Sequence, residues 1–166
     1  MSKKVIRVAT VVDLPSLLMI VNESIRNTVA IYDYDERTLK EQEIWFTDKA
    51  KSGFPVVVAE LDNIIVGFGS YGTFKAKKGY DFTVEHSVYV LPEYKGLGFG
   101  NLLLSDLIKR AKEQELHVMI GYIDASNTAS IDFHKKFGFV ETGHLKQVGF
   151  KFGKWLDVKL MQLILN

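Results

Sequence analysis

The chain has 166 residues, of which 47% are hydrophobic and 25% charged, a size and composition that fit one soluble globular domain over residues 1–166. Its net charge of +1 comes from interspersed acidic and basic residues and argues against nucleic acid or a membrane surface as a partner, while the absence of cysteine excludes disulfides, thiolate nucleophiles and cysteine-based metal sites. Because no apolar run approaches the roughly 18 residues that span a bilayer and the N-terminus lacks a signal-peptide pattern, we expect an intracellular, cytoplasmic protein.

The first third of the chain predicts one strand and two helices. Residues 5–10 form a strand-like apolar run, and an amphipathic helix follows with Pro15 in its first turn. The sequence Thr38-Leu-Lys-Glu41 has the capping-box pattern and predicts the start of a second helix.

Three strands are predicted next. The segments PVVVAEL and IIVGFGSYGTF flank the dipeptide Asp62-Asn63 and predict a β-hairpin. Residues 80–91 then form a long strand whose alternate side chains point to opposite faces. Glu85 and Tyr89 share its polar face, and His86 on the other face is predicted to be a core histidine. That apolar face also holds Phe82, Val84, Val88 and Val90.

The second half of the chain predicts a strand–helix–strand crossover and a final hairpin. A helix with an apolar stripe precedes a strand over residues 117–123, and a short helix follows from Thr128 to Phe137 with Gly138 after its end. Two further strands surround Phe152-Gly153-Lys154. Since a crossover gives parallel strands and hairpins give antiparallel ones, we predict an α+β fold with a mixed, mostly antiparallel sheet flanked by helices.

The segment PEYKGLGFGNLLL, residues 92–104, has Gly96, Gly98 and Gly100 between a strand and a helix. Glycines there expose backbone amides, and the first turn of a helix has amides without intrahelical partners, so this loop predicts an anion site, typically for phosphate. A P-loop pattern is absent, and the Rossmann fingerprint fails because Asn101 stands where its last glycine is required. Asp124, which ends the predicted strand VMIGYID, keeps a dinucleotide alternative open.

The segments SVYVLPEYKGLGFG and NTASIDFHKKFGF resemble motifs of the GNAT N-acetyltransferases. Together with YDFTVEHSVYV, LHVMI and VGFKFGKWLDV they resemble, over nearly the whole chain, the phosphinothricin acetyltransferase group, which includes acetyltransferases of methionine sulfone and sulfoximine. The resemblance implies acetyl-CoA as co-substrate, although Lys95 stands where the superfamily usually has Arg or Gln. The implied acetyl-CoA contacts are Val88, Tyr89, Val90, Lys95, Gly96, Leu97, Gly98, Phe99, Gly100, Asn101 and Asn127.

The chemistry of amine acetylation needs a base, an oxyanion donor and a proton for the leaving thiolate. A neutral amine must attack the thioester, and Glu85 matches the family's catalytic glutamate, which takes the amine proton. The resemblance assigns the oxyanion contact to the backbone amide of Val88. It also puts His134 where many members have tyrosine, and an imidazole there serves as acid or relay.

Acceptor recognition is predicted from fewer residues. Phe74 and Lys75 match a family stretch at the acceptor pocket, where a cation holds an amino acid's carboxylate, and Tyr32 lines the pocket, whereas Trp155 is predicted to pack in the core. The resemblance implies a small amino-acid-like substrate and a homodimer. A polyamine or protein-terminus acetyltransferase and an inactive CoA-binding module stay open as alternatives. His117 and His144 lack metal-ligand spacing, so no metal is assigned.

Overall fold

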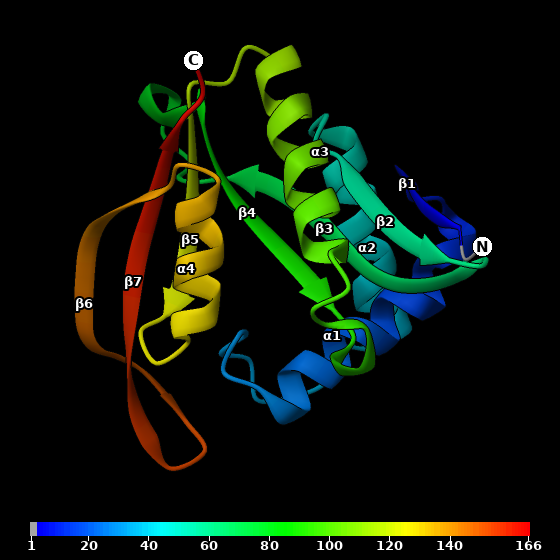
Figure 1. The fold of residues 1–166 in the computed structure, drawn as a ribbon, viewed down its shortest axis with the longest axis horizontal. Helices are drawn as coiled ribbons and strands as arrows, with labels where there is room; N and C mark the ends of the chain where they lie inside the picture. Colours follow the sequence, from blue (N-terminus) through cyan, green and yellow to red (C-terminus); the bar gives the residue numbers. More distant parts are fainter. Residues whose placement is uncertain (1–2) are drawn as a thin grey trace.

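A seven-stranded sheet runs through the computed structural model, which describes residues 3–166 (Figure 1). The strand order is β1-β2-β3-β4-β5-β7-β6, and all neighbours are antiparallel except β4 and β5, which are parallel. The predicted mixed, mostly antiparallel sheet is therefore confirmed. The strands are β1 (Lys4–Val8), β2 (Val56–Leu61), β3 (Ile64–Thr73), β4 (Thr83–Val90), β5 (Val118–Asp124), β6 (Val140–Lys151) and β7 (Lys154–Ile164). The α-helices are α1 (Leu14–Asn27), α2 (Leu39–Lys51), α3 (Phe99–Glu113) and α4 (Thr128–Lys136).

The start of α2 and the turn between β2 and β3 lie where local sequence patterns predict them. The Thr38 hydroxyl accepts a hydrogen bond from the Glu41 amide, which completes the capping box of α2. Asp62 and Asn63 have φ angles of 50° and 69°, the left-handed conformation that a tight hairpin turn requires. The strand predicted over residues 5–10 is shorter, because Thr10 instead starts a 3-10 turn.

The predicted strand over residues 80–91 starts later than expected. Lys78–Tyr80 form a 3-10 turn, and β4 begins only at Thr83. Phe82, predicted to share the apolar face with Val84, is 64% exposed because it precedes the strand, where its carbonyl accepts hydrogen bonds from the amides of His117 and Val118. Its assignment to the apolar face of β4 was wrong.

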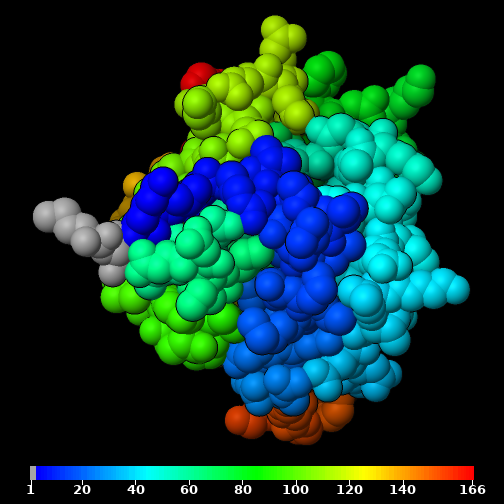
Figure 2. Space-filling model, turned by 90° about the vertical axis from the view of Figure 1, so that its right-hand side faces the viewer, coloured from blue at the N-terminus to red at the C-terminus, as the bar shows by residue number. Residues whose placement is uncertain are grey.

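Helices cover both faces of the sheet and divide the core in two. On one face, the apolar stripe of α3 and Ile131 of α4 pack on inward-facing residues of the central strands. On the other face, α1 packs on β2 and β3, and Trp45 and Phe46 of α2 join it. Figure 2 views the molecule from the side where β1, the β2–β3 hairpin and the helices α1 and α2 form the surface. Within residues 3–166, every helix is too short or too polar to cross a membrane.

The β6–β7 hairpin is fastened to α1 by one buried lysine. Lys151 is 3% exposed, and its Nζ donates to the carbonyls of Ile25, Thr28 and Ile31 at 2.6, 2.8 and 2.6 Å. A cation at this position satisfies carbonyls that the C-terminal end of a helix leaves open and interacts favourably with the helix dipole. The hairpin tip therefore depends on α1, although the two segments lie more than 100 residues apart.

We expect the substitution Lys151→Met to lower the free energy of unfolding by roughly 2–4 kcal/mol, because it leaves three buried carbonyls without their charged donor. Chemical denaturation measures this change. Lys154→Met on the exposed start of β7 is the matched control and should change stability by less than about 0.5 kcal/mol. Equal effects of the two substitutions would contradict the role assigned to Lys151.

Candidate active site

The two parallel strands at the centre of the sheet pair over only three residues. Thr83, Val84 and Glu85 of β4 lie opposite Val118, Met119 and Ile120 of β5, and beyond this point the strands diverge (Figure 1). We call the region between the diverging ends of β4 and β5 the fork.

Backbone groups of β4 point into the fork. The amide of Leu91 donates to Val66 of β3 at 2.9 Å, and alternate residues of an antiparallel strand bond to the same neighbour. The amides and carbonyls of Val88 and Val90 therefore face β5, which no longer pairs with them. These groups are available to an extended ligand that enters the fork.

The glycine-rich loop connects the tip of β4 to the start of α3. Gly96 and Gly98 have φ angles of 79° and 87°, a conformation that other residues rarely adopt, and a β-carbon on either would meet no atom within 4 Å. The backbone conformation is thus the reason for these two glycines. The amide of Leu102 makes the first helical bond, to Gly98, so the amides of the residues before it in the helix have no intrahelical partner.

Positive charge gathers beside this loop. The Lys4 ammonium donates to the Leu97 carbonyl and lies 5.1 Å from the centre of the Phe99 ring, and Lys95 is exposed. Gly100 has a different role, because a β-carbon there would rest 3.6 Å from the ring of Phe133 in α4. The loop combines open amides, the positive end of a helix dipole and two lysines, which together attract an anion.

Glu85 lies at the last paired position before the fork, opposite Gly72 of β3 and Ile120 of β5. Its side chain is on the sheet face that α1 and α2 cover, and it stays accessible to solvent. Desolvation by the surrounding protein raises the pKa of its carboxyl above the ordinary value, and the charge of Lys49 opposes this rise. A carboxylate with a raised pKa is a stronger base than a free one.

Lys49 of α2 is a site residue that the sequence did not reveal. Its Nζ donates to the carbonyl of Tyr71 at 2.8 Å, and a β-carbon at Gly72 would lie 2.5 Å from it. Burial lowers the pKa of Lys49 to about 8, while the charge of Glu85 acts in the opposite direction. The one available signal is its spacing, since Lys49 follows Trp45 by one helical turn and its Nζ lies 5.6 Å from that ring.

Aromatic rings bring the predicted acceptor residues to the same face as Glu85. Phe74 stacks on Tyr122 of β5 at 6.5 Å and meets Tyr80 edge-on at 5.6 Å. Lys75 lies over the rings of Phe74 and Tyr80, at 5.3 and 5.5 Å from their centres. Burial and then the charge of Glu85 raise the pKa of Tyr122, which joins this aromatic group to the carboxylate. The sequence analysis did not assign Tyr122 to the site. The one sequence feature that could have pointed to it is a tyrosine within the otherwise apolar run VMIGYI.

Tyr32 lies at the end of β5, where its hydroxyl donates to Asp124 at 2.8 Å. Asp124 is buried and also accepts a hydrogen bond from the Ser126 amide at 2.9 Å. Through these two hydrogen bonds, the Asp124 carboxylate links Tyr32 to the segment that follows β5. This removes the acidic group on which the dinucleotide alternative depended.

His134 of α4 faces the fork from the sheet face opposite to Glu85. Its Nδ1 lies 2.7 Å from the Ser130 carbonyl and its Nε2 lies 2.9 Å from Nε2 of His86. Burial lowers the pKa of His134. Asn127 caps the same helix, because its Oδ1 accepts from the Ser130 amide at 3.1 Å. His86 is buried as predicted, but its contact with His134 was not foreseen.

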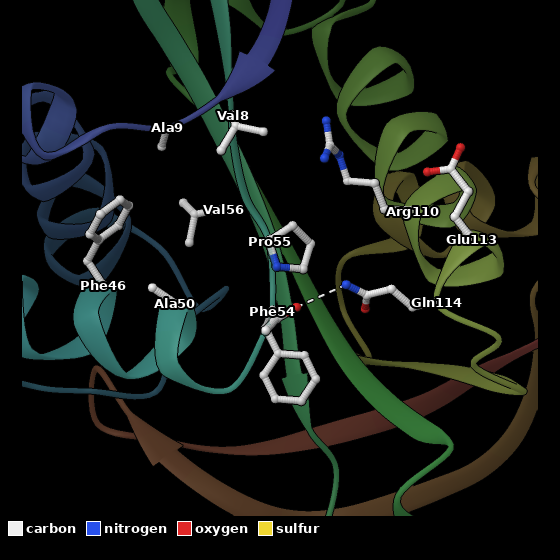
Figure 3. A pocket seen from close by; sticks show the side chains of 11 residues that line it. Val8, Ala9, Phe46, Ala50, Phe54, Pro55, Val56, Arg110, Glu113 and Gln114 are labelled. Atoms are coloured by element: carbon white, nitrogen blue, oxygen red, sulfur yellow. Dashed lines mark hydrogen bonds between the residues drawn. The ribbon is translucent and has the colours of Figure 1, made fainter.

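A separate cavity of about 380 Å³ lies at the opposite end of α3 from the glycine-rich loop (Figure 3). Its walls come from the ends of β1 and α2, from Pro55, and from Arg110 and Glu113 of α3, and Gln114 donates to the Gly53 carbonyl at 2.9 Å beside it. It shares no residue with the predicted site. Within residues 3–166, no group of three His, Cys, Asp or Glu side chains is arranged to hold a metal ion.

The fold and the fork define an N-acetyltransferase, and comparison with known proteins gives the family. The model of the acetyltransferase (GNAT) family matches residues 17–139. The chain therefore belongs to the GNAT family. It is 44% identical over 162 residues to the L-methionine sulfoximine/L-methionine sulfone acetyltransferase of Pseudomonas aeruginosa, and the match covers 97% of this chain and 94% of that protein.

Two solved structures show the same fold. The phosphinothricin acetyltransferase of Sinorhizobium meliloti in complex with acetyl-CoA superposes with a TM-score of 0.96 at 35% identity, covering 98% of this chain and 89% of the other. The ribosomal-protein-alanine N-acetyltransferase of Brucella melitensis gives a TM-score of 0.95 at 46% identity, covering 96% and 99%. The relatives thus agree on N-acetyl transfer and differ in the acceptor that their names give.

We expect the substitution Lys49→Met to raise the pKa of Glu85 further, because the ammonium stabilises the ionised carboxylate. A ¹³C NMR titration of the Glu85 carboxyl measures this pKa directly. The sign follows from the charge: without the cation the carboxylate is harder to form, so its titration moves to higher pH. Lys40→Met, on the exposed N-terminal turn of the same helix, should leave the Glu85 titration unchanged, and a similar shift in both variants would contradict the assignment.

Proposed function

We propose that this protein transfers the acetyl group of acetyl-CoA to the amine of a small amino-acid-like substrate of the methionine sulfone, methionine sulfoximine or phosphinothricin type. The observation that carries the proposal is the position of Glu85, one residue before the fork and next to the aromatic group of Phe74 and Tyr122. The names of the relatives from Pseudomonas and Sinorhizobium support this acceptor class.

Acetyl-CoA fits the open backbone groups of the fork and the loop. The amides from Gly96 to Asn101 suit its pyrophosphate, with Lys4 and Lys95 adding charge. The backbone of Val88, Tyr89 and Val90 would pair with the extended pantetheine arm in the place that β5 leaves. Asn127 uses only Oδ1 for its helix cap, so among the described residues its Nδ2 stays available as a donor to the same arm.

Proton transfer on the two sides of the fork completes the reaction. Glu85 accepts a proton from the substrate ammonium, and the freed amine nitrogen attacks the thioester carbon. The nitrogen loses its second proton to water as the amide forms. The Val88 amide donates to the oxyanion of the tetrahedral intermediate. When the carbon–sulfur bond breaks, its electron pair goes to sulfur, and His134 supplies a proton to the thiolate.

The acceptor pocket is assigned to Tyr32, Phe74, Lys75 and Tyr122 around Glu85. Lys75 would hold the carboxylate of the amino acid as a point charge, where arginine would offer two parallel hydrogen bonds. The aromatic rings would contact the aliphatic part of the side chain.

A second acceptor class, a protein amino terminus, is suggested by the Brucella structure, whose name gives ribosomal-protein alanine as the acceptor. A protein terminus presents an α-amine without a neighbouring carboxylate, so it gains nothing from Lys75. Free amino acids and peptides with a free amino terminus therefore separate the two candidates. A polyamine acceptor is tested in the same panel, and a CoA-binding module without activity would acetylate none of these amines.

Turnover with a panel of amines tests the proposal. We expect methionine sulfone, methionine sulfoximine or phosphinothricin to be acetylated with a higher kcat/KM than peptides or polyamines. The variant Glu85→Gln keeps the shape of the side chain but removes the base, so kcat should fall on the order of 10²-fold with little change in acetyl-CoA affinity. Glu43→Gln on the exposed side of α2 is the control.

We expect His134→Phe to lower kcat less than Glu85→Gln does, because a thiolate with a pKa near 8.5 barely needs an acid at neutral pH. A larger loss of kcat in His134→Phe would make the histidine the base.

Thermal unfolding tests the acetyl-CoA site. We expect acetyl-CoA to raise the melting temperature of the protein and NADH to leave it unchanged. Gly98→Val should reduce the shift with acetyl-CoA, because a β-branched residue resists the φ of 87° that aims the amides. Gly53→Val is matched, since Gly53 also has a positive φ of 71° and open space around it but lies at the end of α2. An equal loss of the acetyl-CoA shift in both variants would speak against the loop.

We also propose a cytoplasmic homodimer. The support for the dimer is the outer face of the β6–β7 hairpin, where Trp155 is 65% exposed and packs on Phe150 with ring centres 5.0 Å apart. The prediction of a core position for Trp155 was therefore wrong. Val148 and Phe152 are exposed on the same edge hairpin. Exposed apolar side chains on an edge strand are typical of an interface.

Light scattering at micromolar concentration tests the dimer. We expect a mass near twice the 18.8 kDa of one chain, and a shift toward 18.8 kDa for Trp155→Glu, because a charge on the apolar face opposes its burial. Lys146→Glu, an exposed change on the same hairpin that adds no charge to the apolar cluster, is the control. A monomer mass for the unmodified protein would exclude the dimer.

A further inference from the structure

The rings of His86 and His134 make three polar contacts of 3.0 Å or less, which together require three protons. Nδ1 of His86 lies 3.0 Å from the Ile120 carbonyl, and Nδ1 of His134 lies 2.7 Å from the Ser130 carbonyl. A carbonyl oxygen only accepts, so each Nδ1 must carry hydrogen. Two neutral imidazoles then have no proton left for their Nε2 atoms, which are 2.9 Å apart and would face each other with lone pairs.

We infer that His86 is a positioning residue for His134, and that the two rings hold a third proton between their Nε2 atoms, which makes the pair the acid that protonates the departing thiolate. This inference rests on the acetyl transfer proposed above. The proton satisfies both Nε2 atoms at once, and it fixes the ring of His134 through a residue of β4.

The position of the pair follows from the fork. His86 is the first residue of β4 after the last pair with β5, and its Nδ1 reaches the carbonyl of Ile120 at the point where that pairing ends. A β-carbon at Gly121 would lie 2.9 Å from Cε1 of His86 and 3.6 Å from Nε2 of His134, so only glycine lets both rings lie against β5. The pair therefore occupies the apex of the fork.

The surroundings oppose and favour the third proton at the same time. Both side chains are 7% exposed. Burial and then the charge of His134 lower the pKa of His86, and burial lowers the pKa of His134. Phe139 packs on both rings, at 5.3 and 5.1 Å, and Phe133 meets His134 edge-on at 5.2 Å. The two carbonyls and the C-terminal end of α4 favour a cation. A proton bound under such opposed influences is readily given up.

The groups that face the pair are known from every element that packs on it. β5 contributes the Ile120 carbonyl and Gly121. α4 contributes the carbonyl of Ser130 and its hydroxyl, which lies 3.5 Å from Nδ1 of His134. The ring of Phe139 follows α4 and packs on both histidines. Among residues 3–166, no carboxylate or ammonium group makes a hydrogen bond or ion pair with either ring. Within the described residues, the protonation of the pair is therefore not coupled to another charged group by direct contact.

The proton balance of the reaction closes with this assignment. As the nitrogen–carbon bond forms and the carbon–sulfur bond breaks, the proton between the Nε2 atoms moves to sulfur and leaves a neutral pair with two protons. Water then returns one proton to the pair, and Glu85 releases to water the proton that it took from the amine. The nitrogen loses a second proton to water when the amide forms. Counted from the ammonium, the net result is one proton moved from nitrogen to sulfur and one released to water.

The resting protonation state is tested by NMR of the protein with ¹⁵N-labelled histidine, without substrate, near pH 6.5. We expect three ring N–H protons for the pair, one of them strongly deshielded and lost in both His86→Phe and His134→Phe. His144→Phe, which removes an exposed histidine paired with Asp157, should leave that signal in place. Two ring protons in the unmodified protein would overturn the inference, whatever the enzyme acetylates.

The role in turnover is tested by the pH profile of kcat with the best acceptor. If His86 holds the proton for His134, His86→Phe should lower kcat by roughly three- to tenfold near pH 6.5, where the pair holds its third proton, and by less than twofold above pH 8, where the pair has lost that proton. KM for acetyl-CoA should stay within twofold. A loss of equal size at every pH would reduce His86 to a packing residue and overturn the inference. If no amine is acetylated, the acid role fails with the proposed function, while the NMR result still decides whether the proton is shared.

Discussion

The separation of β4 from β5 is the constraint on which the site depends. Pairing stops after Glu85 and Ile120, so the backbone of Val88 and Val90 lacks a strand partner on that side. Unpaired backbone groups inside a sheet are costly unless they bond to water or a ligand. The fork therefore predisposes the centre of the sheet to bind an extended chain, and the glycine-rich loop that follows β4 has backbone amides without intrahelical partners at the open end of the fork.

Successive residues of β4 divide the chemistry between the two faces of the sheet. Glu85 points to the face of α1 and α2, and His86 points to the face of α3 and α4, where it meets His134. In the proposed mechanism, the amine loses its proton on one side of the sheet while the thiolate gains one on the other. Burial acts on both sides in the direction that suits each task, since it raises the pKa of the carboxyl and lowers that of the imidazole.

The sequence predicts those features that depend on neighbouring residues. The capping box at Thr38, the turn at Asp62-Asn63 and the glycine-rich loop are local, and each has the conformation expected. The contact of His86 with His134 and that of Lys49 with the Tyr71 carbonyl join distant segments, so no periodicity reveals them. The error at Trp155, which pairs with Phe150 of β6, has the same origin, because only the strand order shows that the β6–β7 hairpin ends the sheet.

This difference explains why the acetyl donor was predictable and the acceptor much less so. Apart from Lys4 and Asn127, the proposed donor contacts lie in one continuous segment from β4 to α3, so one motif describes most of them. The acceptor walls proposed above come from the segment before α2, the connection after β3, and β5, through Tyr32, Phe74 and Tyr122. Substitutions in any of these segments alter the pocket without touching the motif. Relatives of similar sequence can therefore carry names that give different acceptors, as the Pseudomonas and Brucella proteins do.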